Sequence, residues 1–194
     1  MKSEIEVKFL DVDFDDIRQK LKAAGAVCEQ PMRLMRRVII ETPVMKAKNG
    51  YLRVRDEGDK TTVTYKQFDA LSVDGAKEIE FVASDFDAAV NLLDAGGLKY
   101  RSFQESRRET WHMDDCEVVL DEWPWLKPYI EIEGDNEGSL KKSAESLGLD
   151  WSNAVFGDVM VAYRAQYPHV GEHDTVGDIA EVRFEAPLPD LFKS

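Results

Sequence analysis

Polar and apolar residues alternate strictly over several short stretches of the chain, and this pattern predicts β-strands. Residues 3–10 alternate in this way, and residues 51–57 and 61–67 flank Gly58-Asp59, which predicts a β-hairpin. The remaining predicted strands are residues 32–41, 77–83, 99–112, 116–122 and 128–134. About eight strands with few helices indicate an α+β protein, in which an eight-stranded antiparallel sheet closes into a β-barrel with helices packed outside.

Helical spacing of apolar residues follows several of these strands. Asp13 is placed to cap a helix that carries Phe14, Ile17 and Leu21 on one face. Ser84 begins an approximate capping box before a second helix. Further helices are predicted at 138–147, at 152–166 and, as a short element, near 174–180.

The tripeptide Glu-Ile-Glu occurs three times, each time within a predicted strand. Residues i and i+2 of a strand share a face, so each tripeptide places two carboxylates opposite one isoleucine. One copy is typical of an ordinary sheet, whereas three indicate a barrel with an apolar outside and an acidic interior. Crowded carboxylates repel one another unless a cation is present, and Mg²⁺ or Mn²⁺ suits oxygen ligands. The six carboxylates are Glu4, Glu6, Glu78, Glu80, Glu131 and Glu133.

Basic side chains also gather on single faces of predicted strands. Arg53 and Arg55 share one face, with aliphatic residues on the other. The further basic candidates are Lys8, Lys66 and one of Arg107 and Arg108, which point in opposite directions. Such a face beside a carboxylate face fits a polyphosphate with a divalent metal, because arginine and lysine bind phosphate oxygens while carboxylates hold the metal.

The overall charge limits the classes of partner. The 194 residues include 25 basic and 38 acidic side chains, a net charge of −13, which argues against sequence-independent nucleic-acid binding. No apolar run approaches the roughly 18 residues of a membrane span, and the N-terminal stretch is not a targeting signal. Cys28 and Cys116 make no disulfide framework. We therefore expect a cytoplasmic protein with neither nucleic acid nor membrane as its partner.

The ordered set of charged residues resembles the CYTH superfamily of triphosphate tunnel metalloenzymes. Glu4-Ile5-Glu6-Val7-Lys8 matches the ExExK motif of that family. The match continues in order through Arg53-Val54-Arg55, Lys66, Glu78/Glu80, Arg108, Asp121 and Glu131/Glu133. One departure is Ser106, where the family often has a lysine two residues before the arginine. Either Arg107 substitutes for this lysine or one basic contact is missing.

The resemblance implies a tunnel that binds a triphosphate with Mg²⁺ or Mn²⁺ as cofactor. It implies metal binding by Glu4, Glu6, Glu78, Glu80, Asp121, Glu131 and Glu133. Substrate binding falls to Lys8, Arg53, Arg55, Lys66, Arg107 and Arg108, of which Lys8, Lys66 and Arg108 are implied as catalytic. Residues 1–167 are expected to form the tunnel domain, and residues 168–194 a tail that either covers a tunnel mouth or is a free end. We expect Trp123 and Trp125 to pack on the outside.

Three functions remain open at this point. The first is a metal-dependent triphosphatase, a hydrolase acting on tripolyphosphate, ATP or thiamine triphosphate. The alternative is a class IV-type adenylate cyclase, a lyase that converts ATP to cyclic AMP and pyrophosphate. The third is a polyphosphate-binding module without catalysis. The resemblance also allows a homodimer.

Overall fold

The computed structural model describes residues 2–68 and 76–193, and for residues 2–4, 68 and 76 it describes the backbone only. The strands are β1 (Lys2–Glu4), β2 (Glu6–Leu10), β3 (Val27–Ile40), β4 (Gly50–Asp56), β5 (Thr61–Phe68), β6 (Ala76–Ala83), β7 (Ser102–Met113), β8 (Cys116–Glu122), β9 (Tyr129–Gly134) and β10 (Glu181–Val182). The α-helices are α1 (Phe14–Ala23), α2 (Pro43–Lys46), α3 (Phe86–Ala95), α4 (Glu137–Ser146) and α5 (Met160–Gln166). Three short 3₁₀-helices are η1 (Trp151–Asn153), η2 (Val176–Asp178) and η3 (Asp190–Phe192).

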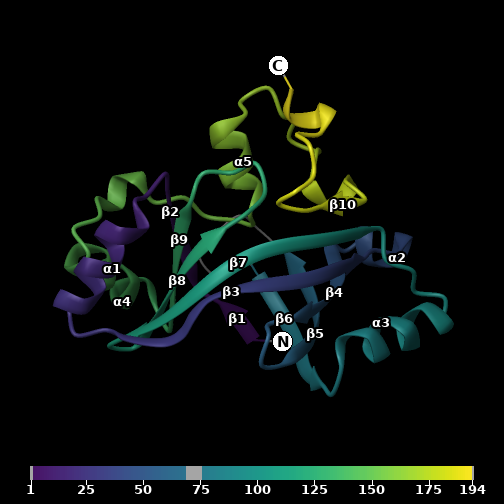
Figure 1. Ribbon diagram of the computed structural model, residues 1–194, viewed down its shortest axis with the longest axis horizontal. Helices are drawn as coiled ribbons and strands as arrows, with labels where there is room; N and C mark the ends of the chain where they lie inside the picture. The colour runs from purple at the N-terminus through teal and green to yellow at the C-terminus, as the bar shows by residue number, and fades with distance from the viewer. Residues whose placement is uncertain (1, 69–75, 194) are drawn as a thin grey trace.

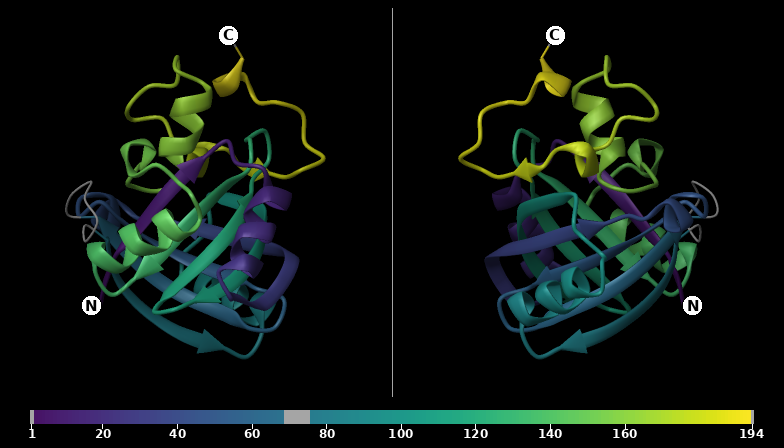
Figure 2. Two further views of the ribbon diagram at one scale, coloured as in Figure 1. Left: turned by 90° about the vertical axis from the view of Figure 1, so that its left-hand side faces the viewer. Right: turned by 90° about the vertical axis from the view of Figure 1, so that its right-hand side faces the viewer.

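The strands form one sheet in the order β1-β6-β5-β4-β3-β7-β8-β9-β2, and all of these pairs are antiparallel. Its two outermost strands, β1 and β2, are consecutive in the chain and are separated only by Ile5. The N-terminal segment thus pairs with β6 at one end and with β9 at the other, which closes the sheet (Figures 1 and 2). Counting β1 and β2 as one interrupted strand, this is the predicted eight-stranded antiparallel barrel.

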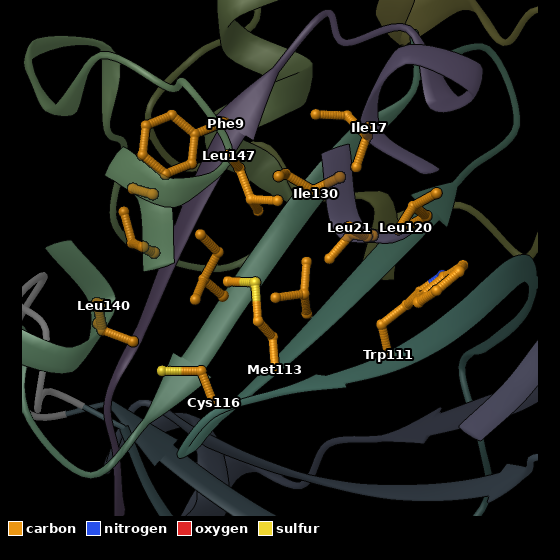
Figure 3. Close-up of a cluster of buried hydrophobic side chains, with 14 residues drawn as sticks. Phe9, Ile17, Leu21, Trp111, Met113, Cys116, Leu120, Ile130, Leu140 and Leu147 are labelled. Carbon is orange, nitrogen blue, oxygen red and sulfur yellow. The ribbon is translucent and has the colours of Figure 1, made fainter. Parts of the chain in front are cut away.

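The hydrophobic core lies outside this barrel rather than within it. The helices α1 and α4 cover the outer face of β2, β8 and β9 (Figure 1). Their buried side chains, such as Ile17 and Leu140, pack with Leu120 and Ile130 from the sheet (Figure 3). Burying this apolar surface against the helices leaves the opposite, polar face of each strand for the barrel interior.

The covering of the outer face is incomplete on β6. Ile132 of the third Glu-Ile-Glu tripeptide is fully buried, whereas Ile79 of the second is 56% exposed. Helix α3 packs instead over Val38, Val54 and Val63 of neighbouring strands. The tripeptide pattern therefore determined which way the isoleucine points but not whether a helix covers it.

Two predicted helices differ in detail from the structure. The stretch 152–166 is not one helix, because Val155 forms a β-bridge with Lys8 between η1 and α5. Gly157, with a φ of +121°, then turns the chain before α5 begins. Asp85 rather than Ser84 caps α3, where it accepts a hydrogen bond of 2.7 Å from the amide of Ala88. In contrast, Asp13 caps α1 as predicted.

The C-terminal residues fold back onto the barrel. Strand β10 pairs in parallel with β7, and η2 forms within the predicted range 174–180. The ring of Phe192 stacks on Tyr163 and on Tyr167, with centroid distances of 4.8 Å in both cases. These contacts form a second hydrophobic cluster that includes Trp123 and Tyr129. Within the described residues, no helix is long and apolar enough to cross a membrane.

Candidate active site

The interior of the barrel contains a cavity of about 710 Å³ with densely charged walls. Among the described residues, seven lysines and arginines and nine carboxylates line it. Eleven of the thirteen residues assigned from the sequence are among them: Glu6, Lys8, Arg53, Arg55, Lys66, Glu78, Glu80, Arg108, Asp121, Glu131 and Glu133. The side chain of Glu4 lies outside the described residues. Strand alternation gives these side chains a common face, and the pairing of the strands in the closed sheet brings the distant segments together.

One wall of the cavity is mainly acidic. It consists of β2, β9 and β8, where the strand register aligns Glu6 with Glu133 and Glu133 with Glu117. The next inward-facing pair along β2 and β9 is Lys8 with Glu131. Glu6, Glu133 and Glu117 thus form a row of three carboxylates across adjacent strands. The next row along β2 and β9 contains the buried cation Lys8 opposite Glu131.

Lys8 is central to this wall and is almost completely buried, with 1% of its surface exposed. Its ammonium lies 2.7 Å from Glu6 and 3.2 Å from Glu131. Burial lowers the pKa of Lys8, but the negative charges of Glu131 and Glu6 outweigh it, so the net pKa is raised. Lys8 therefore remains an ammonium throughout the physiological range.

Arg108 links the acidic wall to the rest of the cavity. Its guanidinium donates two hydrogen bonds to Asp121 and a third, of 2.9 Å, to Glu131. The hydroxyl of Tyr129 is 3.4 Å from the same carboxylate of Asp121. The bidentate pairing fixes the plane of the guanidinium, so its direction in the cavity is preset.

The opposite wall, formed by β3 and β4, is mainly cationic. Arg37 is directly across from Arg55 in the strand register, and Arg53 is next to them on β4. Arg55 pairs with Glu57 at 2.6 Å, but the nearest carboxylate to Arg53 is Glu80 at 3.7 Å. Burial and the neighbouring charge of Arg53 lower the pKa of Arg55 to about 10. This wall therefore holds positive charge that its own carboxylates only partly compensate.

Four buried nitrogen atoms on the cavity wall have no hydrogen-bond partner in the part of the chain that is described. They are Nε of Arg37, Arg53 and Arg101, and Nε1 of Trp123. A buried donor without an acceptor costs about 1–3 kcal/mol, so native proteins rarely keep several together. A ligand rich in acceptor oxygens would satisfy such a group of donors.

The structure separates Arg107 from the other basic candidates. Arg107 points to the outer face, where it pairs with Glu122 at 3.1 Å and stacks on Phe184. It does not line the cavity, whereas the adjacent Arg108 does. Arg107 therefore cannot replace the lysine that is absent at position 106.

Several cavity residues were missed by the sequence analysis. Arg37 could have been found, because Val38 and Ile40 on either side of Ile39 are buried on the outer face and leave Arg37 and Ile39 inside. Glu117 shares the face of Asp121 by the same alternation. Gln104 shares the face of Arg108 in the same way, whereas Arg101 and residues 175–177 carried no sequence signal of this kind.

The expectation for Trp123 holds only in part, because this residue packs in the second hydrophobic cluster and also lines the cavity. Its ring faces the guanidinium of Arg37, with 4.4 Å between the ring centroid and Cζ. Trp125 does pack away from the cavity, where its Nε1 donates to the carbonyl of Ala186. Both tryptophans thus belong to the second hydrophobic cluster, and Trp123 also reaches the cavity.

The cavity has the donor chemistry for a hard divalent cation but no assembled cluster. Among the described side chains, no three His, Cys, Asp or Glu residues are gathered as a metal site. The aligned carboxylates of Glu6, Glu133 and Glu117 nevertheless supply the oxygen donors that Mg²⁺ and Mn²⁺ prefer. These residues therefore fit a cation that arrives together with an anionic ligand.

Comparison with solved structures identifies related folds. A protein from Pyrococcus horikoshii OT3, PH1012, is 26% identical, with a TM-score of 0.66 over 78% of this chain and 93% of that chain. A candidate adenylate cyclase from Vibrio parahaemolyticus is 14% identical, with a TM-score of 0.68 over 84% and 98% of the two chains. A candidate adenylyl cyclase from Hippeastrum, described as having a dominant triphosphatase activity, is 13% identical, with a TM-score of 0.56 over 86% and 96%.

The comparison with protein families uses the sequence itself rather than the fold. A search of curated proteins gives no match. The sequence profile of the CYTH domain matches residues 2–153, which include every charged residue of the predicted motif set. Since this match spans most of the chain, the protein belongs to the CYTH domain family.

Proposed function

We propose that this protein is a divalent-metal-dependent triphosphatase that hydrolyses a phosphoanhydride bond of tripolyphosphate or of an organic triphosphate. One observation supports this most strongly. On one wall of the cavity, arginine side chains carry positive charge that is only partly paired and hold buried donors without an acceptor in the described residues, whereas the other wall is acidic. A triphosphate brings several negative charges and many acceptor oxygens, so it complements the cationic wall. The acidic wall would repel it unless a divalent cation lay between them.

The proposed reaction is attack of water on the terminal phosphorus. The new phosphorus–oxygen bond forms as the bond to the bridging oxygen breaks, and its electron pair leaves on the diphosphate product. The hydrogens of the attacking water remain on the released phosphate or pass to solvent as this phosphate ionises. Catalysis of this kind depends mainly on positioning and on stabilising developing negative charge. Lys8, Lys66 and Arg108 are proposed to neutralise that charge, while Arg53 and Arg55 hold the remaining phosphate oxygens.

Members of the CYTH family are metal-dependent in general, and the acidic wall suits a cation. The residues proposed to hold Mg²⁺ or Mn²⁺ are Glu4, Glu6, Glu78, Glu80, Asp121, Glu131 and Glu133. A bound divalent cation neutralises phosphate charge and lowers the pKa of water near it. The positive charges of Lys8 and Arg108 outweigh burial and lower the pKa of Glu131, so this carboxylate stays ionised at neutral pH, as metal binding requires.

Residues 168–194 are proposed to cover one mouth of the cavity. Thr175, Val176 and Gly177 line it. The hydroxyl of Ser102 on β7 donates to the carbonyl of Ile179 at 2.6 Å, and Arg101 pairs with Asp178 at 2.9 Å. These contacts support a fixed cover that limits the access of bulk water at this end.

Adenylate cyclase activity is the second candidate, because two of the structural neighbours described above carry that name. The 3′-hydroxyl of ATP would then attack the α-phosphorus and release diphosphate, using the same charged residues. A binding module without catalysis is the third candidate. All three share the cavity. The two enzymatic functions differ in the nucleophile and in the phosphorus that it attacks, and the binding module has no reaction.

Product analysis separates these functions. The full-length protein is incubated with tripolyphosphate, ATP or thiamine triphosphate and with Mg²⁺ or Mn²⁺, and both phosphate and cyclic AMP are measured. Phosphate release supports the triphosphatase, and cyclic AMP with diphosphate supports the cyclase. Binding of tripolyphosphate without any turnover of the three substrates would contradict both enzymatic functions.

A further inference from the structure

Arg37 is a buried cation on the cavity wall for which neither the sequence motif nor the family resemblance gives a role. It lies on β3, with 7% of its surface exposed. Its Nη2 donates a hydrogen bond of 2.6 Å to the hydroxyl of Ser106 on β7. One face of its guanidinium is covered by Trp123, and its Nε has no acceptor in the described residues.

Arg37 also differs from its neighbours in its counter-charge. Arg55 pairs with Glu57, and Arg108 pairs with Asp121. Arg37 makes no ion pair with any carboxylate in the described part of the chain, although it is as deeply buried. A buried charge of this kind is costly unless an ion of opposite charge joins it.

The electrostatic surroundings of Arg37 point in the same direction. Burial and the positive charges of Arg55, Arg53 and Arg108 lower its pKa to about 9. It still carries its proton at neutral pH, so four guanidinium groups repel one another across a small volume. An anion between them would relieve this repulsion and accept the free Nε hydrogen of Arg37.

We propose that Arg37 is a substrate-binding residue that contacts phosphate oxygens of the triphosphate, with Ser106 and Trp123 fixing the direction of its guanidinium. This inference rests on the proposed function and extends its binding site. Ser106 stands where the family often has a lysine, and its hydroxyl carries no charge. Arg37, which donates to this hydroxyl from the neighbouring strand β3, supplies a positive charge at this position. A guanidinium offers two parallel donors where lysine offers a point charge.

Binding can be measured without turnover by calorimetry with inorganic tripolyphosphate, in the presence and absence of Mg²⁺. Arg37→Gln is expected to weaken binding about 10- to 100-fold, as for loss of charge-assisted hydrogen bonds. Arg36→Gln is the matched control, because Arg36 is the adjacent residue, faces outward and pairs with Asp56 at 2.6 Å. Its affinity for tripolyphosphate should equal that of the wild type.

A second variant tests whether charge, rather than shape, is what Arg37 provides. Arg37→Gln combined with Ser106→Lys returns a positive charge to the position where the Arg37 guanidinium now donates. This double variant is expected to recover at least about 10-fold of the lost affinity. A purely structural role for Arg37 would not be restored by a lysine on another strand.

The outcomes distinguish this inference from the proposed function. If folded Arg37→Gln binds tripolyphosphate as tightly as the wild type, or if Ser106→Lys restores nothing, the role of Arg37 is wrong. If Arg37→Gln does not fold, Arg37→Met takes its place, because it removes the charge and keeps much of the length of the side chain, and unchanged affinity there overturns the role of Arg37. If the wild type binds tripolyphosphate through Arg37 but hydrolyses no triphosphate, only the proposed enzymatic function is contradicted.

Discussion

The ammonium of Lys8 lies 3.2 Å from the carboxylate of Glu131, directly across the β2–β9 pair, and both side chains face the cavity. Glu131 also accepts a hydrogen bond from Arg108, so one carboxylate joins two cations from different strands. This arrangement connects the N-terminal strand, which closes the barrel, to the proposed catalytic arginine. Protonation of Glu131 would therefore affect both the folded state and the site.

The stability of the protein should depend on pH through Glu131. Burial raises the pKa of Glu131, but the charges of Lys8 and Arg108 outweigh it and lower the pKa from 4.5 to about 2. Because the pKa of Glu131 is lower in the folded than in the unfolded state, the ionised carboxylate stabilises the folded protein. This contribution is complete above about pH 4.5, and it is lost as the pH falls through about 2. Its size is on the order of 3 kcal/mol.

Chemical denaturation of the wild type and of Glu131→Gln between pH 7 and pH 2 measures this contribution. The two proteins should differ most in free energy of unfolding at pH 7 and should converge near pH 2. A difference that stays constant with pH would show that Glu131 acts through packing rather than through its charge.

The adjacent arginines Arg107 and Arg108 should have opposite importance for activity. Arg108→Lys keeps the charge but loses the bidentate contact with Asp121, so we expect kcat to fall about 100-fold. Arg107→Ala removes contacts with Glu122 and Phe184 on the outer face and should leave kcat unchanged. Steady-state kinetics with the best triphosphate substrate provides the comparison, and equal losses in the two variants would rule out a role for Arg108 alone.

Metal dependence should be sensitive to the aligned carboxylates. Glu6→Gln combined with Glu133→Gln removes two charges from neighbouring positions on β2 and β9. We expect the concentration of Mn²⁺ needed for half-maximal activity to rise at least about 10-fold. Glu181→Gln, an exposed residue of β10, is the control. An unchanged Mn²⁺ titration in the double variant would mean that the metal binds elsewhere.

The C-terminal segment should contribute strongly to stability through Phe192. This ring is 2% exposed and stacks on Tyr163 and Tyr167, so Phe192→Ala should cost about 3–5 kcal/mol. Lys193→Ala changes the adjacent exposed residue and should cost little. Urea denaturation measures both variants. A loss below about 1 kcal/mol for Phe192→Ala would mean that the segment is only loosely attached and would weaken its proposed role as a cover.

The sequence by itself determined the strands, their faces and most of the cavity. The period of two along each strand is a local property, so strand alternation alone assigns Glu6 and Lys8 to one face of their strand, and Arg53 and Arg55 to one face of theirs. The resemblance to the CYTH family added which charged residues of these strands belong to one site. Eleven of thirteen assigned residues line the cavity for this reason.

Only the tertiary structure decided between neighbouring charges and placed the segments that follow no period. Strand alternation places Arg107 and Arg108 on opposite faces of β7 but does not say which of these faces is inside the barrel. That depends on which face of the strand packs against the outer core. Arg37 became visible as a cation without a counter-charge among the described residues only when β3, β7 and the Trp123 turn came together, because counter-charge is a long-range property. The position of residues 175–177 on the cavity wall likewise depends on contacts with β7 that are remote in sequence, and no local pattern encodes them.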